Sequence, residues 1–182
     1  MARCVAFLRA INVGGRVVKM DVLRRLFSGA GFTDVETFIA SGNVVFSTTM
    51  KSTATVEQQI EQVLQEGLGY AVPAFVRSLA EVADAAAHRP FSEAEVKDAG
   101  GAHVVAFLRG PLDGAGRKGL AGLQSGIDRF VAHGREVYWL STTSQGASKM
   151  NLVRFELSIG QQATMRSVVS AGKLAARHCT GR

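Results

Sequence analysis

The chain has 182 residues, of which 47% are hydrophobic and 20% are charged, and its formal net charge is +6 at pH 7. This length fits one large domain or two small ones, and the hydrophobic content is enough to build a core, which excludes an intrinsically disordered chain. The charge favours acidic partners, but the basic residues are spread from Arg3 to Arg182, as solvated surface charge usually is.

The first hundred residues alternate between strand and helix patterns. A short apolar run that ends in glycines is typical of a buried strand, and apolar residues three and four apart are typical of a helix. The pattern predicts a strand at 4–11, a helix at 21–30, strands at 35–40 and 44–47, a helix at 56–68 and an edge strand at 73–77. The order is therefore β-α-β-β-α-β.

A connecting region follows the first repeat. Ser78 with Glu81, and Ser92 with Glu95, each have the spacing of a capping box, in which serine and glutamate satisfy each other's backbone donors. We expect a helix from Ser78 to about His88 and a shorter turn after Ser92.

The second half approximates the same order of elements. We expect a strand at 103–109, strands at 127–132 and 136–140, a helix that carries Leu152, Phe155 and Ile159, an extended piece at 163–166 and a last helix at 167–178. Six glycines in residues 110–126 predict that the first helix is short, frayed or replaced by a loop.

Two short sequence motifs, each present twice, support a duplication. Val-Ala-Phe-Leu-Arg occurs at 5–9 and again at 105–109, and Phe-x-Ala-x-Gly follows at 38–42 and 130–134. Matching motifs in the same order indicate a repeated structural unit. We predict an α+β fold of two tandem ferredoxin-like repeats with antiparallel sheets and connecting helices. The first repeat, with its connecting helix, takes residues 1–100, and the second, partly degraded repeat, with a C-terminal helix, takes 101–182.

Several kinds of chemistry are not indicated. Cys4 and Cys179 stand alone and the histidines lack ligand spacing, so we predict no metal and no cofactor. There is no secretion signal and no apolar run long enough to span a bilayer, so we expect a cytoplasmic protein without a membrane partner.

The segment Asn12-Val13-Gly14-Gly15-Arg16, followed by Lys19, is the strongest ligand candidate. Glycines let backbone N–H groups approach an anion, and Arg16 or Lys19 could neutralise it. The alternative is a tight strand-to-helix turn that needs a positive φ at glycine.

The turn Ser41-Gly42-Asn43 belongs beside that loop, because the third strand of this topology pairs with the first. Ser41 and Asn43 could then contact the same ligand, although hairpin-turn chemistry explains Gly42 and Asn43 equally well.

Arginines at strand ends need a partner. Arg9, Arg77, Arg109 and Arg166 adjoin apolar strand residues, and each should meet a carboxylate, a carbonyl or a bound anion. We assign Arg9 and Arg77 to the candidate site and leave open whether their partners are intramolecular.

The segments Leu-Arg-Ala-Ile-Asn-Val-Gly-Gly at 8–15, Ser-Gly-Asn-Val-Val-Phe at 41–46 and His-Gly-Arg-Glu-Val-Tyr at 133–138 resemble the bacterial family called domain of unknown function 1697. The resemblance spans nearly the whole chain and implies an α+β protein with two related halves, but no established activity. Where the family shows Thr-x-Arg-Asn-Trp-Asn-Thr, this chain has Thr-Met-Arg-Ser-Val-Val-Ser at 164–170, so a site built on those residues would be lost.

Our leading hypothesis is a small anionic ligand, such as a phosphate-bearing one, at the first-repeat loops. A nucleic-acid-binding module is the first alternative, favoured by the sequence pI near 9.8 and by a topology shared with RNA-recognition folds. A partner-binding or oligomeric scaffold is the second. No nucleophile, acid–base pair or metal cluster stands out, so the sequence leaves open whether the protein is an enzyme.

Overall fold

A computed structural model describes residues 1–12, 17–39, 42–145 and 150–179 of the chain. They divide into two compact units, Met1–Ala83 with Leu174–Arg182, and Asp84–Lys173. The seam between sequence repeats at Gly100-Gly101 stays a prediction.

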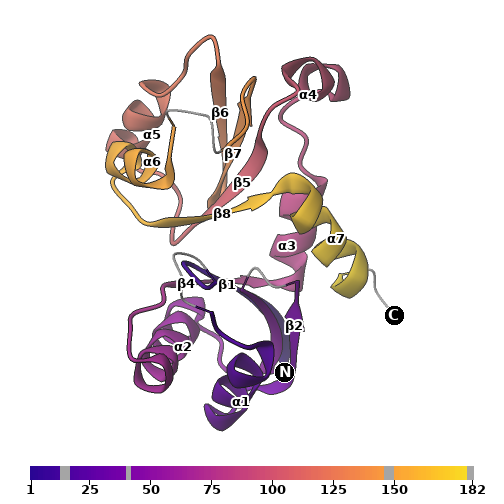
Figure 1. Ribbon diagram of the computed structural model, residues 1–182, viewed down its shortest axis with the longest axis vertical. Coiled ribbons are helices and arrows are strands. Elements are labelled where there is room, and N and C mark those ends of the chain that lie inside the picture. The colour runs from indigo at the N-terminus through magenta and orange to yellow at the C-terminus, as the bar shows by residue number, and fades with distance from the viewer. Residues whose placement is uncertain (13–16, 40–41, 146–149, 180–182) are drawn as a thin grey trace. The chain divides into compact units, whose positions relative to one another are not determined.

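The first unit is a four-stranded antiparallel sheet with two helices on one face (Figure 1). Its strand order is β2-β3-β1-β4, which is the ferredoxin-like order. Its elements are β1 (Ala2–Leu8), α1 (Met20–Gly29), β2 (Thr33–Phe38), β3 (Asn43–Thr48), α2 (Thr53–Leu68) and β4 (Ala74–Ser78), and α3 (Leu79–Ala87) follows directly.

The second unit repeats this arrangement, with strand order β6-β7-β5-β8. Helices α5 and α6 lie together on one face of its sheet (Figure 1). Its elements are α4 (Glu93–Ala99), β5 (His103–Leu108), α5 (Gly114–Ala121), β6 (Asp128–His133), β7 (Glu136–Ser141), α6 (Leu152–Ile159), β8 (Ala163–Ser167) and α7 (Val168–His178), of which the last ends in the first unit. The predicted fold class and the duplication are therefore confirmed.

The two copies of the Val-Ala-Phe-Leu-Arg motif occupy equivalent strands. Phe7 of β1 pairs with Asn43 and Phe75, and Phe107 of β5 pairs with Glu136 and Thr164. Both copies of the motif therefore lie in central strands, and each strand pairs with its two neighbours in the same register as in the other copy.

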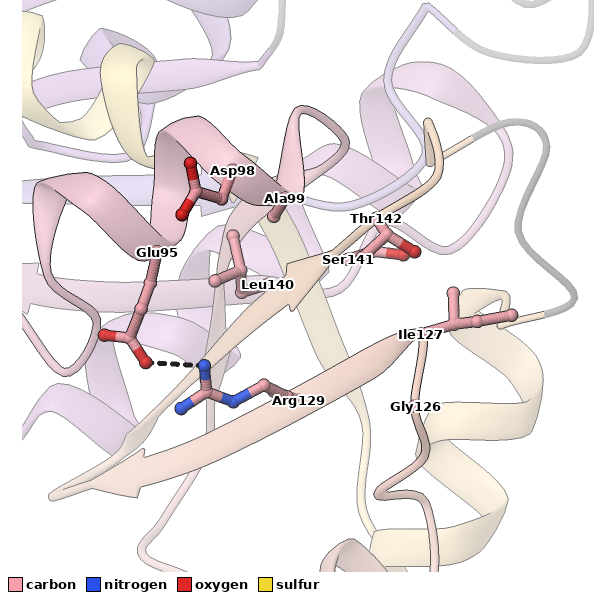
Figure 2. Close-up of a pocket in the computed structure, with 9 residues that line it drawn as sticks. All are labelled: Glu95, Asp98, Ala99, Gly126, Ile127, Arg129, Leu140, Ser141 and Thr142. Carbon is pink, nitrogen blue, oxygen red and sulfur yellow. Dashed lines mark hydrogen bonds and ion pairs between the residues drawn. The ribbon is translucent and has the colours of Figure 1, made fainter.

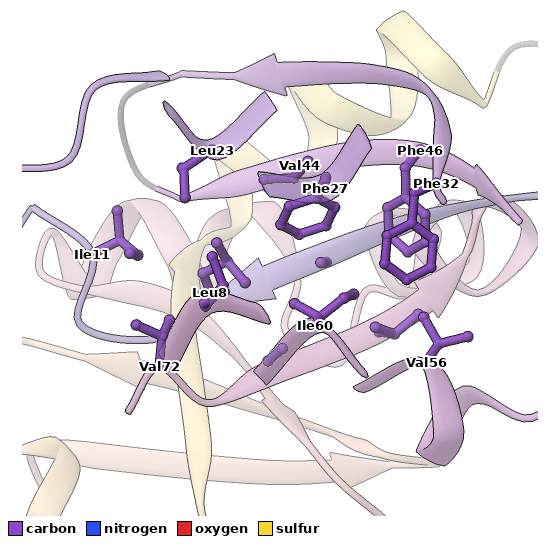
Figure 3. Close-up of a cluster of buried hydrophobic side chains, with 14 of the residues drawn as sticks. Leu8, Ile11, Leu23, Phe27, Phe32, Val44, Phe46, Val56, Ile60 and Val72 are labelled. Carbon is purple, nitrogen blue, oxygen red and sulfur yellow. The ribbon is translucent and has the colours of Figure 1, made fainter. Parts of the chain in front are cut away.

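The first core lies between the sheet and its two helices. Alternate residues of β1, among them Ala6 and Leu8, point into it, as the two-residue period of a strand requires. Figure 3 shows Phe32 and Phe46 together at one end of this cluster and Phe27 nearer its middle, and the ring centroids of Phe32 and Phe46 are 4.8 Å apart. The aromatic residue of β3 is thus part of the core.

The second core is built in the same way around Phe130, Trp139 and Phe155. The Trp139 indole N–H, which would be costly to bury without an acceptor, donates to Asp128 Oδ1 at 2.8 Å. Within the residues that the structure describes, no helix is both long and apolar enough to cross a membrane.

Candidate functional site

Two loops of the first unit meet at one end of its sheet. The antiparallel pairing of Phe7 with Asn43 brings the end of β1 beside the start of β3, and the Leu8 N–H donates to Gly42 O at 2.8 Å. Gly42 has φ +74°, and a Cβ there would lie 3.1 Å from Ile11 Cβ. The turn therefore requires glycine, and the predicted proximity of the two loops is present.

The backbone of these loops is strained at three positions. Ala10 (φ 57°), Asn12 (φ 58°) and Ile39 (φ 57°) are in the left-handed region, which costs a residue with a Cβ about 1–2 kcal/mol. Asn12 tolerates this region best, whereas Ile39 is β-branched and is a true outlier. Asp34 is the other such residue in the described parts of the chain, so the strain is concentrated here.

Asn12 ties the ends of its loop together. Its Oδ1 accepts a hydrogen bond of 2.7 Å from the Val18 N–H, across residues 13–16. Helix α1 then begins after Lys19, whose side chain forms no cap hydrogen bond. Lys19 therefore supplies no side-chain acceptor at the positive end of the helix dipole, although Asp21 places a carboxylate in the first turn.

The predicted ligand residues fall into three groups. Arg9 and Asn12 lie on the first loop and are partly exposed. Gly14, Gly15, Arg16 and Ser41 lie outside the described residues. Asn43 and Arg77 are buried, at 2% and 0% exposure.

The two buried residues already have protein partners. Asn43 Nδ2 donates to Phe38 O at 3.2 Å, across the hairpin, and Arg77 Nη1 donates to Val76 O at 3.0 Å. Arg77 pairs with Val5, two residues before Phe7. These two side chains therefore support the sheet, and Arg9 and Asn12 are the described members that a ligand can reach.

A hollow in the second unit was not predicted (Figure 2). It has a volume of about 280 Å³ and lies between α4 and the strands β6 and β7. Glu95 Oε1 pairs with Arg129 Nη1 at 2.6 Å across it, and Glu95 Oε2 accepts from the N–H and hydroxyl of Ser92 at 2.8 and 2.9 Å. Both predicted capping boxes are present.

These contacts decide the chemistry of Glu95. The Ser92 N–H and the Arg129 guanidinium lower its pKa to about 2, so the carboxylate is ionised at neutral pH and has both oxygens occupied. A general base needs a pKa nearer to the working pH. Glu95 is therefore a structural residue, and sequence spacing could not reveal its pairing with Arg129, which is 34 positions away.

A cluster of rings lies beside the end of α3. The His88 ring stacks on the His133 ring at 3.9 Å, and His133 Nε2 lies 3.1 Å from Asp84 Oδ2. The Tyr138 hydroxyl donates to Ala85 O at 2.7 Å, and burial raises its pKa. The His133 side chain forms these protein contacts while 40% exposed.

Nucleophile and metal chemistry find little support. Burial raises the pKa of the Cys4 and Cys179 thiols, which disfavours the reactive thiolate. Among the described residues, no group of three or more His, Cys, Asp or Glu side chains could hold a metal ion.

A family described as "Protein of unknown function (DUF1697)" matches residues 1–138. The chain belongs to this family. The family resemblance is confirmed, and the DUF1697 match covers both loops of the first unit and continues to Tyr138 in β7. It ends before residues 164–170, so the inferred loss of an Asn-Trp-Asn motif stays a prediction.

A solved structure has the same fold as this DUF1697 protein. It is described as "the structure of conserved bacterial protein SP0830 from Streptococcus pneumoniae", with a TM-score of 0.70 and 20% sequence identity. The match covers 97% of this chain and 98% of that one. A comparison with curated proteins gives no match. The likeness therefore concerns the fold alone, because one fold can carry many functions.

Proposed function

We propose that this DUF1697 protein binds a small anionic ligand at the two loops of the first unit. The observation that carries the proposal is the strained backbone at Ala10, Asn12 and Ile39. Residues held in left-handed conformations persist only where the surrounding structure enforces them, and they cluster at binding and catalytic sites.

Electrostatics support an anion as the ligand. Arg9 and Lys19 flank the loop in sequence, with Arg16 between them. The N-terminus of α1 adds a positive dipole end without a side-chain cap. Asp21 in the first turn of α1 opposes this, but its carboxylate lies 3.5 Å from the Arg25 guanidinium, which offsets part of its charge.

The candidate residues then have distinct roles. Arg9 and Arg16 supply charge, Gly14 and Gly15 supply backbone N–H groups, and Ser41 supplies a hydroxyl. Asn12 holds the loop closed through Val18. Asn43 and Arg77 do not contact the ligand, and they support the site by stabilising the hairpin and the sheet.

Thermal unfolding with candidate anions tests the proposal. Inorganic phosphate, pyrophosphate and a nucleoside monophosphate are compared with sodium chloride at equal ionic strength. A ligand at about 100 times its Kd adds roughly 2.7 kcal/mol to the unfolding free energy. If none of the three raises the melting temperature above the chloride control, the proposal fails for phosphate-bearing ligands.

The duplication supplies a matched control. Arg9 and Arg109 are the last residues of the two copies of the Val-Ala-Phe-Leu-Arg motif, and both are partly exposed. We expect Arg9→Gln to lose the stabilisation by the anion and Arg109→Gln to keep it. Equal losses in both variants would assign the effect to general charge.

The nucleic-acid alternative is less well supported by the described residues. RNA-recognition folds of this topology stack bases on aromatic residues of the central strands. Phe46, the ring that β3 offers, is completely buried in the core between Phe27 and Phe32. An oligonucleotide titration against salt tests the alternative, because binding through several phosphates weakens linearly with the logarithm of salt concentration.

One observation favours the scaffold alternative. Val153 and Leu157 are four residues apart on α6 and are 60% and 80% exposed, so they form an apolar stripe on one helix face. A solution mass above that of the monomer, lowered by Leu157→Asp, would support this alternative.

A further inference from the structure

A second hollow in the second unit has an apolar wall and a cationic rim. It lies between α4, the start of β5 and the start of α7 and has a volume of about 390 Å³. This volume is within the range of pockets that hold small ligands. Phe91, Val96, Val168 and Val169 form the apolar wall. Val169 is 66% exposed, so apolar surface at this hollow remains in contact with water.

Gly172 lines the same hollow, and the fold gives no reason for a glycine there. It is the fifth residue of α7, and glycine inside a helix costs roughly 0.5–1 kcal/mol relative to alanine. A Cβ at this position would meet nothing within 4 Å, and its φ is not left-handed. Neither close packing nor backbone conformation requires glycine, and its effect is to leave the hollow open.

The rim of the hollow is positive. Arg89 and Lys97 outnumber Glu93, and Lys97 is exposed and forms no ion pair with the described residues. Arg89 donates from Nη1 to the carbonyl oxygens of Ala86 and His88, which holds its guanidinium beside the end of α3.

His103 also lines the hollow. Its ring meets the Phe91 ring edge-on, with centroids 6.1 Å apart. Burial and the nearby positive charge of Arg89 lower the pKa of His103. A bound anion would oppose the field of Arg89, whereas a bound cation would add to it.

We propose that this hollow binds a small amphiphilic carboxylate, with an apolar body against Phe91, Val169 and Gly172 and its carboxylate beside Lys97 and Arg89. The apolar wall selects a hydrocarbon or aromatic body, since its exposed area is removed from water on binding. The charge of the rim selects the anionic head group. This site lies in the second unit and is independent of the loop site proposed above.

Calorimetric titration with octanoate and with 4-phenylbutyrate tests the proposal, both below the concentrations at which they form micelles. We expect saturable binding of at least one of them, weaker binding of the neutral 1-octanol, and no binding of acetate, which lacks the apolar body. Octanol that binds as tightly as octanoate would overturn the role of the rim. No saturable binding of either carboxylate would overturn the site.

Gly172→Leu is the decisive variant. Its side chain would enter the hollow, so we expect octanoate affinity to fall by about tenfold or more, a change of at least 1.4 kcal/mol. Its melting temperature should be unchanged or higher, because a helix-interior glycine is removed. Gly114→Leu is the matched control, since a Cβ at Gly114 of α5 also meets nothing within 4 Å.

Two further variants separate the possible outcomes. Lys97→Gln should weaken octanoate binding about two- to fivefold, the size of an exposed ion pair. Arg9→Gln should leave octanoate binding unchanged, so failure of the loop site and failure of this site are distinguishable. Equal octanoate affinity in Gly172→Leu and the parent protein would overturn the proposal.

Discussion

Arg77 and Arg166 occupy the same position in the two copies of the duplicated sheet. Arg77 of β4 pairs with Val5, and Arg166 of β8 pairs with Val105. Val5 and Val105 are the first residues of the two copies of the Val-Ala-Phe-Leu-Arg motif. Each Nη1 donates to the carbonyl oxygen of the preceding residue, Val76 at 3.0 Å and Met165 at 2.8 Å. The duplication therefore preserves a side-chain contact as well as the order of the strands.

Replacing Arg77 by methionine should destabilise the protein more than the same change at Arg166. Arg77 is completely buried, whereas Arg166 is partly exposed. A hydrogen bond from a charged donor contributes about 1.5–3 kcal/mol, and a buried acceptor left without its donor adds to the loss. Urea unfolding of Arg77→Met and Arg166→Met gives the comparison directly. An Arg77→Met variant as stable as the parent would show that this arginine is dispensable to the fold.

Gly119→Ala should destabilise the second unit through its helix pair. A Cβ at Gly119 of α5 would lie 1.7 Å from Ser158 O in α6, and one at Gly116 would lie 2.9 Å from Ile159 O. The two helices would have to separate, which typically costs about 1–3 kcal/mol. Gly114→Ala, where the added Cβ meets nothing within 4 Å, is the control. Equal melting temperatures for the two variants would contradict this explanation.

These glycines show where the fold could and could not be predicted. Strand positions followed from apolar runs between turn residues, which depend on local sequence. The glycines of 110–126 indicated only a weakened helix, and α5 is indeed short, with eight residues. Their purpose, a close approach to α6, depends on residues about forty positions away and has no local signature.

Which residue caps a helix could not be decided from the sequence. Asp21 belongs to the residue types that favour an N-cap, but α1 begins at Met20 after Lys19. Ser148 and Asn151 both precede Leu152 in the sequence, and both are residue types that favour an N-cap. Asn151 has that role, and its side chain accepts from the Arg154 N–H at 2.9 Å. Several polar residues near a helix start can each serve as its cap, and tertiary packing selects among them.

The candidate site was predictable only in part. The pairing of the first and third strands placed Asn12 and the Gly42 turn at one end of the sheet, because topology determines that. Burial of Asn43 and Arg77 could not be read from single residues. The hollow beside Gly172 was also invisible, because it is formed by α4 and α7, which are distant in sequence.

The Glu95 carboxyl should titrate far below an ordinary glutamate. Its main stabilising contact is the Ser92 N–H, followed by Arg129, and its pKa is about 2. In Arg129→Gln we expect the pKa to rise but to stay below the ordinary 4.5, because the Ser92 contacts remain. A carboxyl-detected NMR titration measures both values. A pKa that reaches 4.5 in Arg129→Gln would assign the whole effect to the ion pair.

Stability should decrease as the pH falls below 6.5, and His103 should account for part of this. Burial is the main cause that lowers the pKa of His88, His103 and His178 from 6.5 in the folded state. The unfolded chain therefore binds protons more tightly than the folded one, and the unfolding free energy falls as the pH drops from 6.5 toward the folded values. Around His103, Arg89 lowers the pKa further, and Lys97 and Glu93 line the same hollow.

His103→Gln should reduce this dependence on pH. The measurement is urea unfolding of both proteins between about pH 5 and 8, the range in which histidine titrates. The difference between them at pH 8, where His103 is neutral in both states, isolates the packing effect of the substitution. The parent should lose more stability than the variant between pH 7 and 5, because only the parent has a proton to take up at position 103. Parallel curves for the two proteins over this range would show that His103 titrates equally in the folded and unfolded states.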